Sequence, residues 1–219
     1  FFGGPEKCPV VRVSGRTYPV EVKWLKPEDD ENPFEDYVTQ AVNTAVDLHR
    51  QNPPADGDIL VFLTTPLETE KCCEEFLQKC PTDNSFQCLP LHGKLQPEEQ
   101  QKVFQPNRPN KRKVVFATNS AETSVTITGV RFIVDTGLAK EMRFDPKRNI
   151  SSLCVYPISQ SSAEQRKGRA GRTSPGKCYR LYNEKTYETM EKSTKPEILR
   201  VHLGQALLKL LELGVEPLF

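Results

Sequence analysis

The sequence predicts an α/β fold in which a mostly parallel sheet carries helices on both faces. Short β-rich runs alternate along the chain with segments of helical periodicity, which is the order of elements in such folds. Two of these runs, residues 59–63 (Ile-Leu-Val-Phe-Leu) and 114–117 (Val-Val-Phe-Ala), are continuously apolar. That composition is typical of strands covered on both faces, as the strands of a parallel sheet are.

The first elements are two strands and a long helix. Residues 10–13 and 18–24 predict strands around a turn at Gly15-Arg16. A helix with one buried face follows, because the apolar residues recur at three-and-four spacing. These residues are Phe34, Tyr37, Val38, Ala41, Val42, Ala45 and Val46. Asn52-Pro53-Pro54 is expected to end this helix.

The remaining elements complete the sheet. Helices are expected over 66–79 and 97–104, and strands over 86–91, 130–134 and 176–182. Ligands of open parallel sheets bind beyond the carboxyl ends of the strands. The loops after Leu63, Leu91, Ala117 and Val134 are therefore the expected place of a site.

Two segments depart from this alternation. Residues 140–158 alternate without a helical period and predict a β-hairpin inserted into the fold. Residues 196–213 are leucine-rich at helical spacing and predict one helix, with Gly214 as its stop.

Composition excludes several classes of protein. Of the 219 residues, 37% are hydrophobic and 27% charged, and the net charge is +1. No apolar run approaches the ~18 residues of a membrane span, so no membrane partner is expected. The seven cysteines form no Cys-x-x-Cys pair, so we expect reduced thiols in an intracellular protein and no metal site. The chain does not begin with Met, and we expect it to be a piece of a longer protein.

The most specific segment is 165–172, Gln-Arg-Lys-Gly-Arg-Ala-Gly-Arg. Ser162 with Gln165 forms a capping-box pattern that would begin a helix, and helical spacing then places Gln165, Arg169 and Arg172 on one face. Two guanidinium forks facing an open cleft could neutralise a transferring phosphoryl group while the amide orients water. The alternative is an exposed basic helix. Each Gly would cost such a helix about 1 kcal/mol against Ala.

A second polar segment, residues 117–127, directly follows a buried strand. Thr118 and Asn119 lie where their donors could contact a phosphodiester. Ser124, about one turn further on, could contact a phosphate. The alternative is a capped loop without a ligand.

Taken together, these segments resemble DEAH-box helicases, the DEAH/RHA branch of superfamily 2. Residues 165–172 resemble motif VI of that family, 118–126 motif V, 59–64 motif IV and 134–140 motif Va. On this resemblance the chain is identified as the second RecA-like domain over residues 1–183. Residues 184–219 would begin the winged-helix segment.

The resemblance implies roles for individual residues. Arg169 and Arg172 would be arginine fingers for ATP hydrolysis, and Gln165 would position the attacking water. ATP and its Mg²⁺ would be held mainly by a first RecA-like domain. Further contacts to the nucleotide are expected from Phe104, which would stack on the base, and from Ser124 and Thr128. Single-stranded RNA is expected to contact Thr118, Asn119, Gly93 and Lys140.

The sequence also departs from the family pattern. Lys167 stands where Ala is usual and Ser120 where Ile is usual. Thr65-Pro66 replaces an expected Gly-Gln, and Thr128 stands where many relatives have an acid that contacts the ribose. Phe104 has a simpler alternative role as a core residue of its helix.

The function expected from these observations is that of an ATP-dependent RNA helicase, nuclear or cytoplasmic. The expected partners are single-stranded RNA, the first RecA-like domain, the winged-helix domain and a regulatory protein. A non-catalytic RNA-binding or scaffold module and a DNA-directed translocase remain alternatives. The 219 residues contain neither a G-x-x-x-x-G-K-[ST] phosphate loop nor an Asp-Glu-Ala-His motif, so the chain by itself is expected to be inactive.

Overall fold

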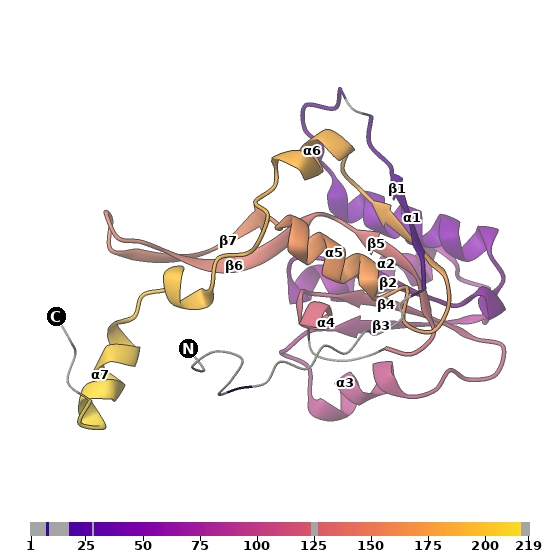
Figure 1. The fold of residues 1–219 in the computed structure, drawn as a ribbon. Coiled ribbons are helices and arrows are strands. Elements are labelled where there is room, and N and C mark those ends of the chain that lie inside the picture. Colours follow the sequence, from indigo (N-terminus) through magenta and orange to yellow (C-terminus); the bar gives the residue numbers. More distant parts are fainter. Residues whose placement is uncertain (1–7, 9–17, 28, 124–126, 216–219) are drawn as a thin grey trace.

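The parallel sheet predicted from the sequence is present. The computed structural model describes residue 8 and residues 18–27, 29–123 and 127–215. In this part of the chain six strands form one sheet in the order β1-β8-β5-β2-β4-β3, and all neighbours pair in parallel (Figure 1). The strands are β1 (Val20–Trp24), β2 (Asp58–Phe62), β3 (Phe86–Leu91), β4 (Arg112–Ala117), β5 (Val130–Asp135) and β8 (Gly176–Arg180). The strand predicted over 10–13 lies outside the described residues.

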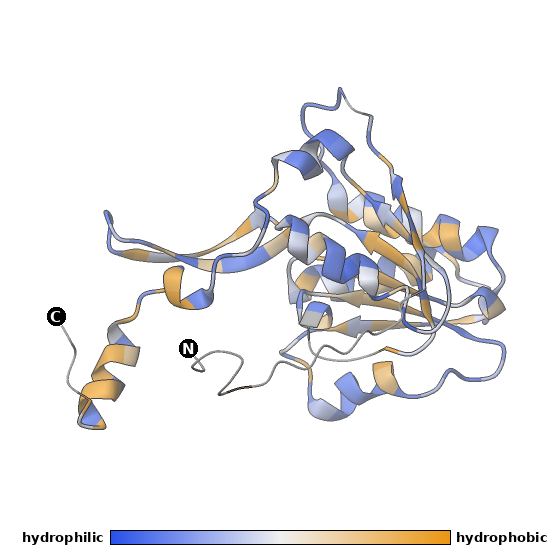
Figure 2. Ribbon diagram, in the orientation of Figure 1, coloured by the Kyte–Doolittle hydropathy of each residue, from blue (hydrophilic) through white to orange (hydrophobic). Residues whose placement is uncertain are grey.

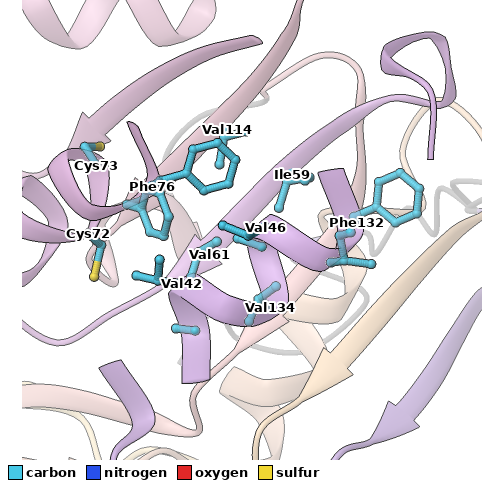
Figure 3. Packing of buried hydrophobic residues seen from close by; sticks show 14 of the residues in the cluster. Val42, Val46, Ile59, Val61, Cys72, Cys73, Phe76, Val114, Phe132 and Val134 are labelled. Carbon is cyan, nitrogen blue, oxygen red and sulfur yellow. The ribbon is translucent and has the colours of Figure 1, made fainter. Parts of the chain in front are cut away.

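Helices α1 (Tyr37–Gln51) and α2 (Pro66–Lys79) cover one face of this sheet. Their side chains form one apolar core with the strands, in which Val42 and Phe76 pack against Val61 and Val134 (Figure 3). The other face carries α3 (Pro97–Phe104), α4 (Ser120–Thr123) and α5 (Gln160–Gly168). A second core there joins helix and strand residues such as Val103 and Val115. Helices on both faces are therefore confirmed.

The ends of α1 and α2 explain two features of the sequence. Asn52 is the residue at which α1 ends, and the following prolines lead into a short 3₁₀ turn, η1 (Pro54–Asp56). Thr65 caps α2 through a capping box with Glu68, and Pro66 occupies the first helical turn. The Thr-Pro pair that departs from the family pattern thus begins a helix well.

Two helix starts differ from the expectation. Helix α1 begins at Tyr37 and not near Phe34, because Asp36 adopts a left-handed conformation with φ of 52°. The capping box predicted for Ser162 and Gln165 was wrong. Ser159 is the N-cap of α5, and its side chain accepts a hydrogen bond from the backbone N–H of Ser162.

The predicted hairpin is confirmed. Strands β6 (Leu138–Asp145) and β7 (Ile150–Pro157) pair in antiparallel register, with Lys140 opposite Val155. The hairpin projects away from the main sheet (Figure 1).

The C-terminal region is more broken than the single helix predicted over 196–213. It contains a 3₁₀ turn, η2 (Glu197–Leu199), and a separate helix, α7 (Gly204–Glu212). Gly214, with φ of 75°, ends α7 as expected. The leucines of α7 are exposed, and the helix stands out as apolar in Figure 2.

Along the chain, after the last sheet strand and before α7, comes a helix that the sequence did not indicate, α6 (Glu184–Thr189). Met190 directly after it is buried in a cluster with Tyr182 and Ala163. Packing onto the sheet domain thus continues past residue 183. The division at 183 and the winged-helix identity of residues 184–219 stay predictions. No helix in the described residues combines the length and hydropathy that crossing a membrane requires.

Candidate nucleotide and nucleic-acid site

The loops after β3 and β4 lie side by side at the carboxyl edge of the sheet. The backbone N–H of Thr118 donates to the carbonyl of Leu91 at 3.0 Å. Gly93 and Asn119, which were both expected to contact nucleic acid, are exposed on these neighbouring loops. An added Cβ at Gly93 would meet no atom within 4 Å, so this loop offers its backbone to solvent without obstruction.

Thr118 and Lys140 are less accessible. The side chain of Thr118 is buried, and its hydroxyl oxygen lies 3.0 Å from that of Ser120. The Ser that replaces the usual Ile therefore engages the Thr118 hydroxyl within the loop. Lys140 is half-buried on β6, at the base of the hairpin. Of Thr118 and Asn119, the two residues expected to contact a phosphodiester, only Asn119 has an exposed side chain.

Arg166 is the central residue of the motif, and sequence reasoning missed it. Its side chain is fully buried. Nε donates to the Glu122 carboxylate at 3.1 Å, Nη1 to Asp135 at 2.8 Å and Nη2 to the Leu138 carbonyl at 3.0 Å. The guanidinium also lies over the Phe62 ring, 4.7 Å from its centroid. One side chain thereby joins α5 to α4, to the end of β5 and to the start of the hairpin.

The carboxylate of Asp135 is held from several sides. Besides Arg166, it accepts hydrogen bonds from the Tyr182 hydroxyl at 2.9 Å and from the Gly137 N–H at 3.0 Å. Burial alone would lower the pKa of Arg166, but the charges of Asp135 and Glu122 raise it above its ordinary value. Arg166 is therefore charged at any physiological pH and compensates both carboxylates.

A three-and-four spacing in the sequence could have revealed this inward face. Ala163, Arg166 and Ala170 are all fully buried, at positions separated by three and four residues. Ala163 and Arg166 share the inward face of α5, and Ala170, in the turn after the helix, packs into the second core. Gln165 and Arg172, which were expected to contact water and phosphate, lie on the exposed side of the segment.

The two predicted finger arginines occupy different environments. The helix ends at Gly168, so Arg169 and Arg172 lie in the turn beyond it and do not continue a helical face. Arg172 is exposed, as is Gln165. Arg169 is 7% exposed, and its guanidinium donates to the backbone carbonyl of Glu122. The expectation that both arginines face an open cleft was therefore wrong for Arg169.

The charges of the two arginines lie close enough to influence one another. Burial lowers the pKa of Arg169, the positive charge of Arg172 lowers it further, and the negative charge of Glu122 opposes both effects. Two guanidinium groups that repel each other are both stabilised when negative charge comes near them. An anion with several oxygens, such as a polyphosphate, would supply that charge.

Phe104 and Thr128 lie nearer the amino edge of the sheet. Phe104 is the last residue of α3 and packs half-buried on the second core, which includes Ile127. Thr128 is exposed two residues before β5 begins. These two expected nucleotide contacts are therefore not at the carboxyl edge, where the site was expected. Ser124 lies outside the described residues.

Gln165 and Asn119 line one cavity of about 340 Å³ between α4, α5 and the base of the hairpin. The expected water-positioning residue, Gln165, and the expected nucleic-acid contact, Asn119, therefore border a common space. In the described residues no cluster of His, Cys, Asp or Glu could hold a metal ion.

Comparison with known proteins identifies this arrangement. Residues 40–174 match the model of the helicase conserved C-terminal domain. The chain belongs to that family. Over 212 residues it is 48% identical to the ATP-dependent RNA helicase DEAH12, chloroplastic, of Arabidopsis thaliana, covering 95% of this chain and 12% of the relative. It is also 44% identical over 217 residues to the pre-mRNA-splicing factor ATP-dependent RNA helicase prp22 of Schizosaccharomyces pombe, covering 97% and 18%.

Together with solved structures, these relatives identify the chain as part of a DEAH-box helicase. The DExH-box NTPase HrpB of E. coli superposes with a TM-score of 0.77 at 35% identity, covering 91% of this chain and 24% of that one. A second structure, of the Escherichia coli DEAH/RHA helicase HrpB, gives a TM-score of 0.78 at 33% identity, covering 92% and 24%. This chain thus spans between 12% and 24% of the length of these relatives.

Proposed function

We propose that this domain is one half of an ATP-dependent RNA helicase. A first RecA-like domain would hold ATP and Mg²⁺, and the domain described here would close on them from the face that carries α3 and α5. Arg169 and Arg172 would contact the phosphates, Gln165 the attacking water, and Phe104 the base. Single-stranded RNA would run past Gly93, Asn119 and Lys140.

The observation that carries this proposal is the double attachment of α4. The Glu122 carboxylate binds Arg166, and the Glu122 carbonyl accepts from Arg169. The backbone N–H of Glu122 donates in turn to the carbonyl of Asn119 at 2.9 Å. The same turn of chain thus borders the proposed RNA contact and holds a proposed finger. A change in α4 on RNA binding would therefore reach the phosphate-binding groups directly.

The chemistry assigned to these groups is electrostatic. Phosphoryl transfer spreads negative charge over the oxygens of the transferring group, and guanidinium forks stabilise that charge. The exposed amide of Gln165 can accept from water and orient it. A binding or scaffold module would have no need of two adjacent guanidiniums in the turn after α5.

The test is hydrolysis and unwinding by a chain that joins this domain to a first helicase domain. We expect ATP turnover that rises on adding single-stranded RNA and rises less on adding single-stranded DNA of the same sequence. Equal stimulation by DNA would favour the DNA-directed translocase. RNA binding without ATP turnover would favour the non-catalytic module and contradict the proposal.

The isolated chain of 219 residues is expected to release no phosphate from ATP, with or without RNA. Its sequence holds no phosphate loop to cradle the β- and γ-phosphates, and fingers without that cradle cannot position the reaction. Phosphate release should be measured over successive purification steps. Activity that co-purifies with the chain at constant specific activity would contradict this expectation.

A further inference from the structure

A buried lysine holds the end of α3 on both sides of Phe104. Lys113, on β4, is 2% exposed, and its ammonium donates to the carbonyls of Val103 and Gln105 at 2.8 Å each. These are the carbonyls of the residues directly before and after Phe104. They belong to the last turn of the helix, where carbonyl groups lack partners within the helix itself. A cation at this position also meets the negative end of the helix dipole.

The chain beyond Phe104 is fixed by Asp58, at the start of β2, which also binds the backbone of Lys113 on β4. Asp58 accepts from the side-chain amide of Asn107 at 2.7 Å and from the backbone N–H of Lys113 at 2.8 Å. The segment from Val103 to Asn107 is thus tied at both ends. Phe104 lies between the two carbonyls that Lys113 holds, and it is half-buried.

Lys113 is a charged residue on a strand face that is otherwise apolar. Lys113 shares the face of β4 with Val115 and Ala117, which are fully buried in the second core. Burial lowers the pKa of Lys113, and the charge of Asp58 opposes this effect. An ammonium in such a place costs desolvation that an apolar residue would avoid. The two hydrogen bonds to carbonyls flanking one aromatic residue give that residue a fixed backbone.

We infer that Lys113 is a positioning residue for the base of the bound nucleoside triphosphate, acting through the backbone on either side of Phe104. This inference rests on the proposed function, in which Phe104 stacks on the base. A ring held before the ligand arrives loses less conformational entropy on binding. Lys113 itself touches no ligand in this arrangement.

The experiment is a double-mutant cycle in a chain that joins this domain to a first helicase domain. Dissociation constants for a non-hydrolysable ATP analogue are measured for Phe104→Ala, Lys113→Met and the double variant. We expect Phe104→Ala to weaken binding roughly tenfold, as loss of one base stack does. Lys113→Met should weaken binding roughly threefold or more, and the double variant should bind no more weakly than Phe104→Ala alone.

The readouts separate positioning from a merely structural role. Inhibition by inorganic tripolyphosphate, which has no base, should be the same in the wild type and in Lys113→Met. Turnover at saturating ATP should stay within about twofold of the wild type, because the effect falls on ground-state binding. Lys102→Met is the matched control, since Lys102 is exposed on the same helix, and it should bind the analogue normally.

The outcomes distinguish a failure of base stacking by Phe104 from a failure of the role of Lys113. Unchanged binding in Phe104→Ala would overturn the stacking assigned under the proposed function, and this inference with it. Weaker binding in Phe104→Ala with unchanged or independently additive effects of Lys113→Met would overturn only the role of Lys113. If Lys113→Met does not fold, the exposed Asn107 provides the second variant. Asn107→Ala should weaken binding roughly twofold, and this effect should vanish when Phe104 is Ala.

Discussion

Replacing Arg172 by Ala is expected to lower ATP turnover by roughly 10³-fold or more in a chain that contains both helicase domains, as for other arginine fingers. Arg172 is exposed in the turn after α5, so its removal leaves no buried cavity. Binding of ATP in the ground state should change much less than turnover. An interaction made mainly in the transition state lowers kcat and leaves affinity nearly intact.

Arg169→Ala should differ from Arg172→Ala in one measurable way. The guanidinium of Arg169 is buried against the Glu122 carbonyl, and a hydrogen bond from a charged group contributes about 1.5–3 kcal/mol. Arg169→Ala should therefore lower both turnover and melting temperature. Lys71→Ala, at an exposed position on α2 across the sheet, is the control and should change neither.

Turnover number and melting temperature should be measured on the same preparations. Normal turnover in Arg172→Ala would remove it from the catalytic groups. Loss of several degrees in Arg172→Ala with turnover unchanged would make the turn after α5 a scaffold element.

The sheet could be predicted from the sequence because its strands carry their own signal. The runs at 59–63 and 114–117 are apolar throughout, and they fall on β2 and β4, in which every residue is buried. Boundaries were less predictable, since they depend on single residues in contact with the rest of the fold. Ser159, for example, caps α5 and also lies 2.9 Å from the hydroxyl of Thr194, a contact that no local pattern indicates.

The site was predicted only on its exposed side. Gln165, Arg172 and Asn119 were selected because polar groups in specific motifs suggest ligands; all three are exposed, and their roles stay predictions. Glu122 and Asp135 were not singled out, although both bind Arg166. Their importance comes from pairing across elements 31 and 44 residues apart in sequence, which single-chain periodicity does not encode.

Arg166→Met is expected to be the most destabilising single change in this part of the domain. It leaves Glu122 and Asp135 without the cation that compensates them, and breaking a buried ion pair by removing one partner costs about 3–5 kcal/mol. For a chain of this length, that corresponds to a fall in melting temperature on the order of 10 °C. Thermal unfolding of the 219-residue chain, followed by circular dichroism, measures the effect.

The cause can be separated from loss of volume by neutralising a partner. Met replaces the aliphatic stem of the arginine with a flexible apolar chain of similar length, so a cavity should contribute little. Adding Glu122→Gln to Arg166→Met removes one of the stranded charges and should recover part of the lost stability. Arg148→Met is the control, because its side chain is 80% exposed and its ion pair with Asp145 spans 3.9 Å, a geometry that contributes almost nothing. If Arg166→Met melts with the wild type, or if Glu122→Gln lowers its stability further, the buried charge network does not hold α4, α5 and the hairpin together.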